Sequence, residues 1–300
     1  PPPPPPPPFS SRRRHTRSAS SSRGLGDVYK RQERRGVAAT VLEAGSVDEA
    51  VAVARRAVAD GAPRLIAVGG DGVVNIAVNA VAQRPTILGV VPYGTGNDFA
   101  RALGLIDGGL DGQVDRALAE PVAVDAIRTN HGWVATVATL GFSGDVTERA
   151  NGLRWPRGQL RYTVATLLQL PRLRTLPVDV EVDGRRLGGD TTLLAVGNTP
   201  YFGGGMRICP DVRTDDGLVQ AVSIGAVSRP TFLRVFPSVF SGRHIGRREV
   251  ATATGVVVTI TGSAVDLWAD GDRLGPLPVR LEAVAGALRV AGARPSERPS

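Results

Sequence analysis

Two glycine-rich stretches hold the residues whose types and spacing could do chemistry. The first, Gly69-Gly-Asp-Gly72, follows the apolar run 65–68, and an apolar segment of helical character comes after it. Glycines let backbone N–H groups approach a phosphate closely, and a helix N-terminus adds favourable dipole charge. Asp71 would hold Mg²⁺ or orient groups beside a nucleotide. The alternative is a tight strand-to-helix turn without a ligand. The second stretch is Gly94-Thr-Gly-Asn-Asp98.

The elements around these stretches predict an α/β domain. Ser46-Val-Asp-Glu49 is a capping box that opens a helix, and Gly61 follows that helix. Short apolar strands that alternate with helices predict a mostly parallel sheet with both faces covered. The expected strands lie at 35–42, 65–68 and 86–91, and the expected helices at 47–59, 73–81 and from the second stretch through Leu103.

The pattern changes near Pro121 to short strands and turns. Asp183-Gly184 is a hairpin turn signal. Two helical regions, 160–170 and 230–240, interrupt the strands, and the whole predicts a mostly antiparallel β-sandwich. The expected strands are 122–127, 133–140, 178–182, 192–196, 218–224, 255–261, 265–268 and a final strand at 287–291.

Residues 1–32 differ from the rest of the chain. They combine an octaproline run with a Ser/Arg-rich stretch that lacks apolar periodicity, which predicts disorder. They resemble translated adapter sequence, and Lys30 is the only lysine of the chain, so we expect this segment to be non-native. The expected divisions are 33–121 for the α/β domain, 122–286 for the β-sandwich domain, 287–293 for a strand that returns to the first domain, and 294–300 for a tail.

Charge and composition narrow the classes of function. The net charge is +8, but seven of the 36 basic and one of the 28 acidic residues lie in 1–32. The remainder, with 29 basic and 27 acidic residues, is nearly neutral, which argues against nucleic acid as a partner. Cys209 is the single cysteine, which suits a reducing, cytoplasmic compartment, and we interpret it as a packed apolar residue. His131 and His244 are interpreted as surface or loop residues.

Together, these motifs resemble those of the diacylglycerol kinase family of bacterial lipid kinases, which is related to sphingosine kinases and NAD kinases. The resemblance covers roughly 36–291. It implies a three-layer nucleotide-binding α/β domain, a C-terminal β-sandwich domain that takes the lipid substrate, and an active site between them. The implied reaction transfers the γ-phosphoryl group of ATP, with Mg²⁺, to a lipid hydroxyl at the inner membrane face, most simply that of diacylglycerol. The motifs are the two glycine stretches with Asn75, Gly203-Gly-Gly-Met206 with Pro210-Asp211, Asp215-Asp-Gly-Leu218 and Asp270-Gly-Asp272.

The resemblance also implies a role for individual residues. Asp270 matches the general base, and Asp272 stands two residues on, where the family usually has Glu. Asp125 matches a metal–water network, and Asp215, Asp216 and the carbonyl of Leu218 match a structural Mg²⁺ site. Homodimers are also implied. The nucleotide-binding positions would be Gly69, Gly70, Asp71, Gly72, Asn75, Gly94, Thr95, Gly96, Asn97 and Asp98.

Some of these residues also have simpler interpretations, and several positions depart from the family pattern. The segments Asp270-Gly271 and 215–217 have the composition of turns, and Asp98 suits the first turn of a helix. Val73, Ile76 and Ala80 stand where the family usually has Thr, Glu and Gly, and the family's first strand and its loop have no match here. We therefore expect little or no kinase activity from this chain, although a parent protein with the first strand would be active. The alternatives are a catalytically impaired nucleotide- or lipid-binding homologue and an NAD kinase-like enzyme.

Overall fold

The structure is a computed structural model, which describes residues 28, 30, 31, 35–153, 155, 159–262 and 265–294. Most of the segment expected to be disordered, and all of the tail from residue 295 on, lie outside these residues. Val28 and Arg31 are described, and both contact helix α5 (Gly109–Leu118). Val28 is buried beside Val114, and Arg31 forms an ion pair of 2.8 Å with Asp111. The expectation of disorder is therefore wrong for this short piece.

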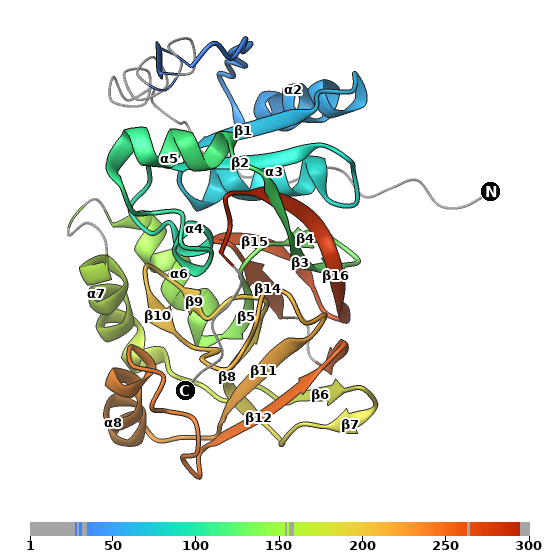
Figure 1. Cartoon of the computed structure of the whole chain (residues 1–300). Coiled ribbons are helices and arrows are strands. Elements are labelled where there is room, and N and C mark those ends of the chain that lie inside the picture. Colours follow the sequence, from blue (N-terminus) through green and yellow to red (C-terminus); the bar gives the residue numbers. More distant parts are fainter. Residues whose placement is uncertain are drawn as a thin grey trace.

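Helices occur in both halves of the chain (Figure 1). They are α2 (Val47–Ala59), α3 (Asp71–Val81), α4 (Asp98–Ala102), α5, α6 (Phe142–Gly152), α7 (Gln159–Gln169), the 3₁₀ helix η1 (Leu170–Arg172) and α8 (Arg229–Val239).

The strands form two large sheets and one small hairpin. They are β1 (Arg64–Gly69), β2 (Ile87–Pro92), β3 (Pro121–Thr129), β4 (Gly132–Val134), β5 (Val137–Gly141), β6 (Val178–Val182), β7 (Arg185–Arg186), β8 (Thr191–Gly197), β9 (Tyr201–Phe202), β10 (Met206–Arg207), β11 (Val219–Gly225), β12 (Val250–Gly255), β13 (Val257–Gly262), β14 (Asp266–Ala269), β15 (Asp272–Pro276) and β16 (Val279–Ala291).

The N-terminal domain is an α/β structure, as predicted. β1 and β2 pair in parallel, with Gly69 opposite Pro92, so both strands end at the same edge of the sheet. Alternate residues of the strands point to opposite faces. Leu65 and Ala67 pack in the cluster that contains the buried residues of α2 and α3, whereas Ile66 and Val68 pack with those of α5. Helices therefore cover both faces, and the two glycine stretches follow neighbouring strand ends.

Helix α2 has the predicted bounds because its ends are specified locally. The Ser46 side chain accepts a hydrogen bond from the Glu49 N–H at 3.1 Å, and the Glu49 carboxylate accepts from the Gly45 N–H at 2.6 Å. These contacts satisfy two N–H groups at the N-terminal end of the helix.

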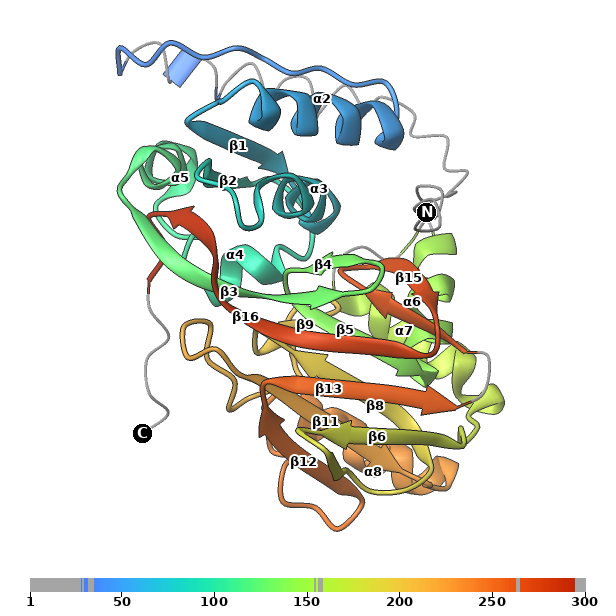
Figure 2. The same cartoon turned by 90° about the vertical axis from the view of Figure 1, so that its right-hand side faces the viewer.

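The strand predicted over 35–42 is wrong. This segment has no strand partner, and Val37, Val41 and Leu42 are exposed. Figure 2 shows it along the side of α2 that faces away from β1. Extended backbone forms a strand only by pairing with a sheet edge. Among the described residues, β1 pairs with β2 alone. Helix α2 lies between β1 and residues 35–42, so these residues do not reach the unpaired edge of β1.

The C-terminal domain is the predicted β-sandwich. One sheet has the strand order β12-β11-β8-β5-β14-β15, and its neighbours pair antiparallel. The facing strands belong to the second sheet, in which β13 lies between β6 and β16, and β3 pairs with β16 and β4. Buried side chains of both sheets form one apolar cluster, which includes Leu140, Leu194, Val258 and Leu281.

β16 joins the two domains. Its first half pairs antiparallel with β13 in the sandwich, and Val290 near its end lies opposite Leu88 of β2 in parallel. The strand expected over 287–291 is thus the last part of a longer strand. Helices α5 and α6 were not predicted. None of the described helices combines the length and the apolar character that crossing a bilayer requires.

Two predicted strands are each interrupted where their backbone N–H groups donate hydrogen bonds to a carboxylate instead of to a neighbouring strand. The segment 133–140 divides into β4 and β5 at Ala135 and Thr136, and their N–H groups donate to Asp270. The segment 255–261 divides at Val256, where the chain passes from one sheet to the other and N–H groups donate to Asp183. Asp183 lies in the predicted β6–β7 hairpin turn.

Candidate active site

The two glycine stretches contact each other through their backbones. Gly70 caps the start of α3, and a Cβ atom added to Gly94 would lie 2.4 Å from the Gly70 Cα. No real Cβ atom approaches backbone so closely, so position 94 must be glycine for the loops to meet, whereas a Cβ atom on Gly70 would lie 3.2 Å from the Gly94 Cα, a tight contact. Glycine is needed here for the close approach, and Gly72, where an added Cβ would meet nothing within 4 Å, is not under this constraint.

Asp71 fixes the second loop to the first. Its Oδ2 accepts the N–H of Asn97 at 2.8 Å, and its Oδ1 accepts the N–H of Asp98 at 2.8 Å. These are N–H groups at the start of α4, which lack partners within the helix. Burial raises the pKa of Asp71, and the backbone hydrogen bonds oppose that shift. The carboxylate thus orients groups of the second loop, one of the two roles proposed for it.

Asn97 closes the second loop on itself. It has a left-handed backbone (φ 53°), its Oδ1 accepts the Gly94 N–H at 3.0 Å, and its Nδ2 donates to the Gly94 carbonyl at 2.9 Å. The N–H groups of Gly94, Asn97 and Asp98 are therefore all bonded inside the protein. This corrects the expectation that the whole loop offers N–H donors, and it leaves Thr95 and Gly96 as the candidates.

Asp98 combines the helix-start position with a connection to the other domain. Its Oδ2 accepts the N–H of Gly204 at 2.8 Å, and Gly204 lies in the turn of the β9–β10 hairpin. Its buried Oδ1 has no hydrogen-bond partner among the described residues. Burial, with a contribution from the charge of Asp71, raises the pKa of Asp98 to about 6. The glycines of 203–205 all have positive φ, which explains this motif as a tight turn.

Asp270 is a hairpin-turn residue whose side chain points into the protein. It has a left-handed backbone (φ 51°) in the β14–β15 turn, as its composition suggested. Its Oδ2 accepts from Asn75 Nδ2 at 2.6 Å and from the Ala135 N–H at 3.0 Å. Its Oδ1 accepts the N–H of Thr136 at 3.0 Å and also the Thr136 hydroxyl.

These contacts set the chemistry of Asp270. Burial raises its pKa, and the hydrogen bonds from Thr136, Ala135 and Asn75 lower it. The result is a fixed carboxylate that is more basic than an exposed one. Because Asn75 lies on α3, directly after the first glycine stretch, its bond to Asp270 holds the turn beside the two glycine stretches. Asn75 is thus a hydrogen-bond partner of Asp270. Asp272, in contrast, is exposed at the start of β15.

The proposed metal residues lie together, although their oxygens have other partners. Asp125 accepts the N–H of Gly217 at 2.6 Å and that of Gly286 at 2.8 Å. Asp215 pairs with Arg213 at 3.0 Å, and Asp216 accepts the N–H of Leu218 at 3.0 Å. In the part of the chain that the structure describes, no group of three His, Cys, Asp or Glu residues could hold a metal ion.

The fit to a metal therefore differs between two places. The turn at 215–218 does not present a free set of oxygen ligands. Asp98, whose Oδ1 is buried without a partner and lies near the charge of Asp71, offers an oxygen that a cation prefers. A metal that arrives with a nucleotide fits the second place better than the first.

Several residues of the site were missed by sequence reasoning. Asn79 binds Trp133 through both its amide atoms and so fastens α3 to β4, while Ala135 and Thr136 hold Asp270. The spacing of Asn75 and Asn79, four residues apart on one helix face, was a usable signal. His244 lies in a turn, as one of the two interpretations had it, but it is buried and contacts the Ile208 carbonyl, so it is not a surface residue. Cys209 is buried, as interpreted, and burial raises its pKa.

Comparison with known proteins gives consistent results for both domains. Residues 16–129 match the model of the diacylglycerol kinase catalytic domain, and residues 136–292 match that of the YegS C-terminal NAD kinase beta sandwich-like domain. A diacylglycerol kinase of Mycobacterium tuberculosis is 38% identical over 267 residues, which cover 87% of this chain and 86% of the relative.

More distant relatives extend the match. A diacylglycerol kinase of Bacillus subtilis is 30% identical over 262 residues, covering 85% of this chain and 86% of the relative. A crystal structure of a putative diacylglycerol kinase from Bacillus anthracis superposes with a TM-score of 0.70 at 20% identity, covering 89% of this chain and 93% of that one.

Proposed function

The chain belongs to the diacylglycerol kinase family of lipid kinases, and we propose that it transfers the γ-phosphoryl group of ATP to the hydroxyl of a diacylglycerol. The observation that carries the proposal is the hydrogen bond between Asn75 and Asp270. It joins the helix that follows the first glycine stretch to the turn that bears the expected base, so that phosphate-binding backbone and a basic carboxylate share one site.

The residues of the site divide the work of phosphoryl transfer. Gly72, Thr95 and Gly96 provide backbone at the meeting of the two loops, where the nucleotide phosphates would lie. Asp98, with the charge of Asp71 beside it, would hold the Mg²⁺ of the nucleotide, which offsets charge on the phosphoryl group. Asp270 would accept the proton of the lipid hydroxyl as the hydroxyl oxygen attacks the γ-phosphorus and the bond from that phosphorus to the leaving ADP breaks. The raised pKa of Asp270 favours that transfer, and its hydrogen bonds fix the direction of approach.

The departure at Val73 affects nucleotide binding rather than the base. Val73 is 44% exposed at the start of α3, beside the first glycine stretch, and it has no hydroxyl. The network around Asp270 includes neither Val73 nor Ile76. This separation supports a kinase with weakened nucleotide binding over a homologue without a catalytic base.

The test compares phosphorylation by the 300-residue chain and by Asp270→Asn. Vesicles of phosphatidylcholine that contain dioleoylglycerol are incubated with Mg²⁺ and γ-labelled ATP, and labelled phosphatidic acid is measured. Asn has the same shape but no basic carboxylate, so we expect a loss of about 10²–10⁴-fold in kcat. Equal activity in Asp270→Asn would overturn the assignment of the base.

Two further measurements separate the alternatives. ATP binding by titration calorimetry, without lipid, should be retained in Asp270→Asn, because that residue does not contact the phosphate loops directly. Binding of ATP without any transfer by the unsubstituted chain would identify an impaired homologue. Phosphorylation of NAD in place of the lipid would identify an NAD kinase-like enzyme and contradict the proposal.

A further inference from the structure

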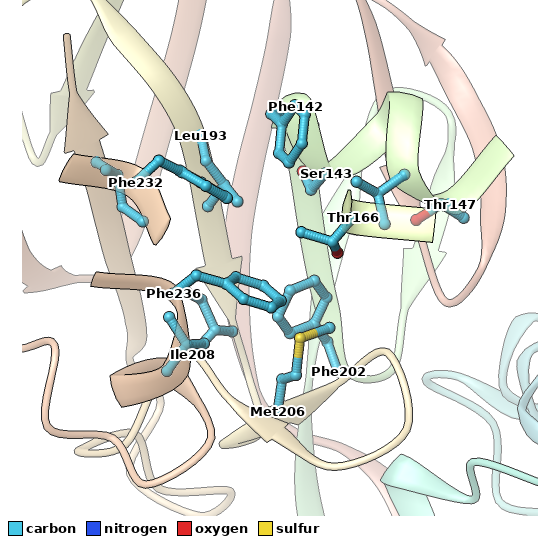
Figure 3. Close-up of a pocket in the computed structure, with 13 residues that line it drawn as sticks. Phe142, Ser143, Thr147, Thr166, Leu193, Phe202, Met206, Ile208, Phe232 and Phe236 are labelled. Carbon is cyan, nitrogen blue, oxygen red and sulfur yellow. The ribbon is translucent and has the colours of Figure 1, made fainter. Parts of the chain in front are cut away.

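A pocket lies in the C-terminal domain between one sheet of the sandwich and three helices. Side chains from α6, α7 and α8 line it on one side, and side chains from β8 to β11 on the other (Figure 3). The space between its lining side chains, counted together with the open solvent at its mouth, is about 460 Å³. Its principal apolar lining comes from Phe142, Leu193, Phe202, Met206, Phe232 and Phe236.

The pocket has a rigid aromatic wall. The rings of Phe142 and Phe232 meet edge to face with their centres 4.9 Å apart, and Phe232 stacks on Phe236 at 5.6 Å. The Ser143 hydroxyl, which also faces the pocket, is bonded to the Leu140 carbonyl. A cavity with such a lining holds water poorly and favours an apolar ligand.

One structural element joins this pocket to the phosphate-binding loops. The β9–β10 hairpin places Phe202 and Met206 in the lining of the pocket. The turn of the same hairpin donates the Gly204 N–H to Asp98 at 2.8 Å. A ligand in the pocket therefore lies against the hairpin that also contacts the loop of the second glycine stretch.

The helices that cover the pocket are apolar on their outer side as well. Leu160, Leu167 and Leu168 of α7 and Leu233 of α8 are exposed, whereas Thr166 of α7 is buried in the pocket lining. In water, exposed leucines on neighbouring helices are unfavourable, but they suit contact with a bilayer.

We infer that this pocket binds one acyl chain of the lipid substrate and thereby sets the chain length that the enzyme accepts. This inference rests on the proposed function, because it names the part of the diacylglycerol that the pocket holds. The chain lies between the aromatic wall and Thr166, with the β9–β10 hairpin at the end nearer Asp98. The pocket is narrow, so entry of a chain displaces the flexible side chain of Met206.

Direct binding tests the inference without catalysis. The probe is cis-parinaric acid, a long-chain fatty acid whose fluorescence rises in apolar surroundings. We expect the unsubstituted chain to bind it, and Thr166→Phe, which fills the pocket, to bind it at least about tenfold more weakly, because each methylene excluded from an apolar site weakens binding about fourfold. Leu167→Phe adds a ring on the outer face of the same helix and should bind like the unsubstituted chain.

Two controls keep the test decisive. Thr166→Val keeps the volume of the side chain without its hydroxyl and should retain binding. Circular dichroism melting identifies a variant that does not fold, and Ser143→Leu, which fills the pocket from α6, then replaces Thr166→Phe. Absence of binding by the unsubstituted chain would overturn the inference. So would a folded Thr166→Phe or Ser143→Leu variant that binds the probe as tightly as the unsubstituted chain.

Activity then tests the link to the substrate. We expect Thr166→Phe to lose at least about tenfold in kcat/KM with dioleoylglycerol but to keep its activity with dihexanoylglycerol, whose chains are short. Equal losses with both substrates would contradict a pocket that measures chain length. If no variant or parent phosphorylates any lipid while parinarate binding follows the expected order, the proposed function fails and the pocket assignment stands.

Discussion

The two glycine loops (69–72 and 94–98) and the apolar pocket are built on opposite principles. In the loops, glycines bring two backbones together, and the carboxylates of Asp71 and Asp270 each accept hydrogen bonds at defined distances. In the pocket, side chains from three helices and several strands contribute apolar surface, and aromatic contacts shape the wall. A change in the loops should therefore alter geometry and charge, whereas a change in the pocket should alter packing.

The largest expected effect on stability comes from removing an aromatic ring from the wall of the pocket. Phe232 is 1% exposed and contacts both Phe142 and Phe236, so Phe232→Ala should lower the free energy of unfolding by about 3–5 kcal/mol. Leu233→Ala, one residue away but 42% exposed, should change it by less than about 1 kcal/mol. Urea unfolding measures both. Equal effects would mean that Phe232 does not pack as described.

The next effect concerns the buried charge of Asp98. Its folded pKa of about 6 lies above the ordinary value, so the folded state takes up the proton first as pH falls. Holding the charged form in the folded state costs at most about 3 kcal/mol, fully felt above pH 6 and relieved as pH falls toward 4. Asp98→Asn should therefore gain stability over the unsubstituted protein at pH 7.5 and lose most of that gain at pH 4.5.

Thermal melting across this pH range measures the difference. The comparison between the two proteins cancels titrations elsewhere in the chain. A stability difference that does not change with pH would contradict a raised pKa at Asp98.

A smaller change in stability should accompany a new methyl group between the loops. Gly94→Ala places a Cβ atom 2.4 Å from the Gly70 Cα, which should destabilise the fold by about 1–3 kcal/mol and weaken ATP binding as the loops separate. Gly72→Ala is the matched control, because its Cβ meets nothing within 4 Å and its stability should stay within about 0.5 kcal/mol. Calorimetry and urea unfolding together check the pair, and equal behaviour of the two variants would exclude close contact of the loops.

The smallest expected effect is a gain in ATP binding when a hydroxyl is added beside the first glycine stretch. Val73 is exposed beside the first glycine stretch, so Val73→Thr should leave stability nearly unchanged. Its hydroxyl could donate one hydrogen bond to a phosphate, which contributes about 0.5–1.5 kcal/mol, or about 2–12-fold in the dissociation constant of ATP. Val73→Ala, which shortens the side chain without adding a donor, is the control. No difference between the two variants would show that position 73 does not contact the nucleotide.

Local patterns predicted the elements that carry their own signals. Helix α2 begins where Ser46 and Glu49 cap it, and the Asp183-Gly184 and Asp270-Gly271 turns formed as their composition indicated. Patterns that needed a distant partner were less reliable. The segment 35–42 has the composition of a strand but pairs with nothing, and the run 133–140 is broken because Asp270, far along the chain, takes two of its N–H groups.

The sequence by itself determined the position of the two glycine loops, because a glycine, a carboxylate and a strand end act over a few residues, and their order along the chain suggests the chemistry proposed for them. Only the tertiary structure decided what those residues contact. It placed Asn75 on Asp270 and Gly204 on Asp98, and it assembled the apolar pocket from residues spread over about a hundred positions. The physical reason is that hydrophobic packing has no direction or fixed spacing, so its partners are set by how the sheets and helices come together.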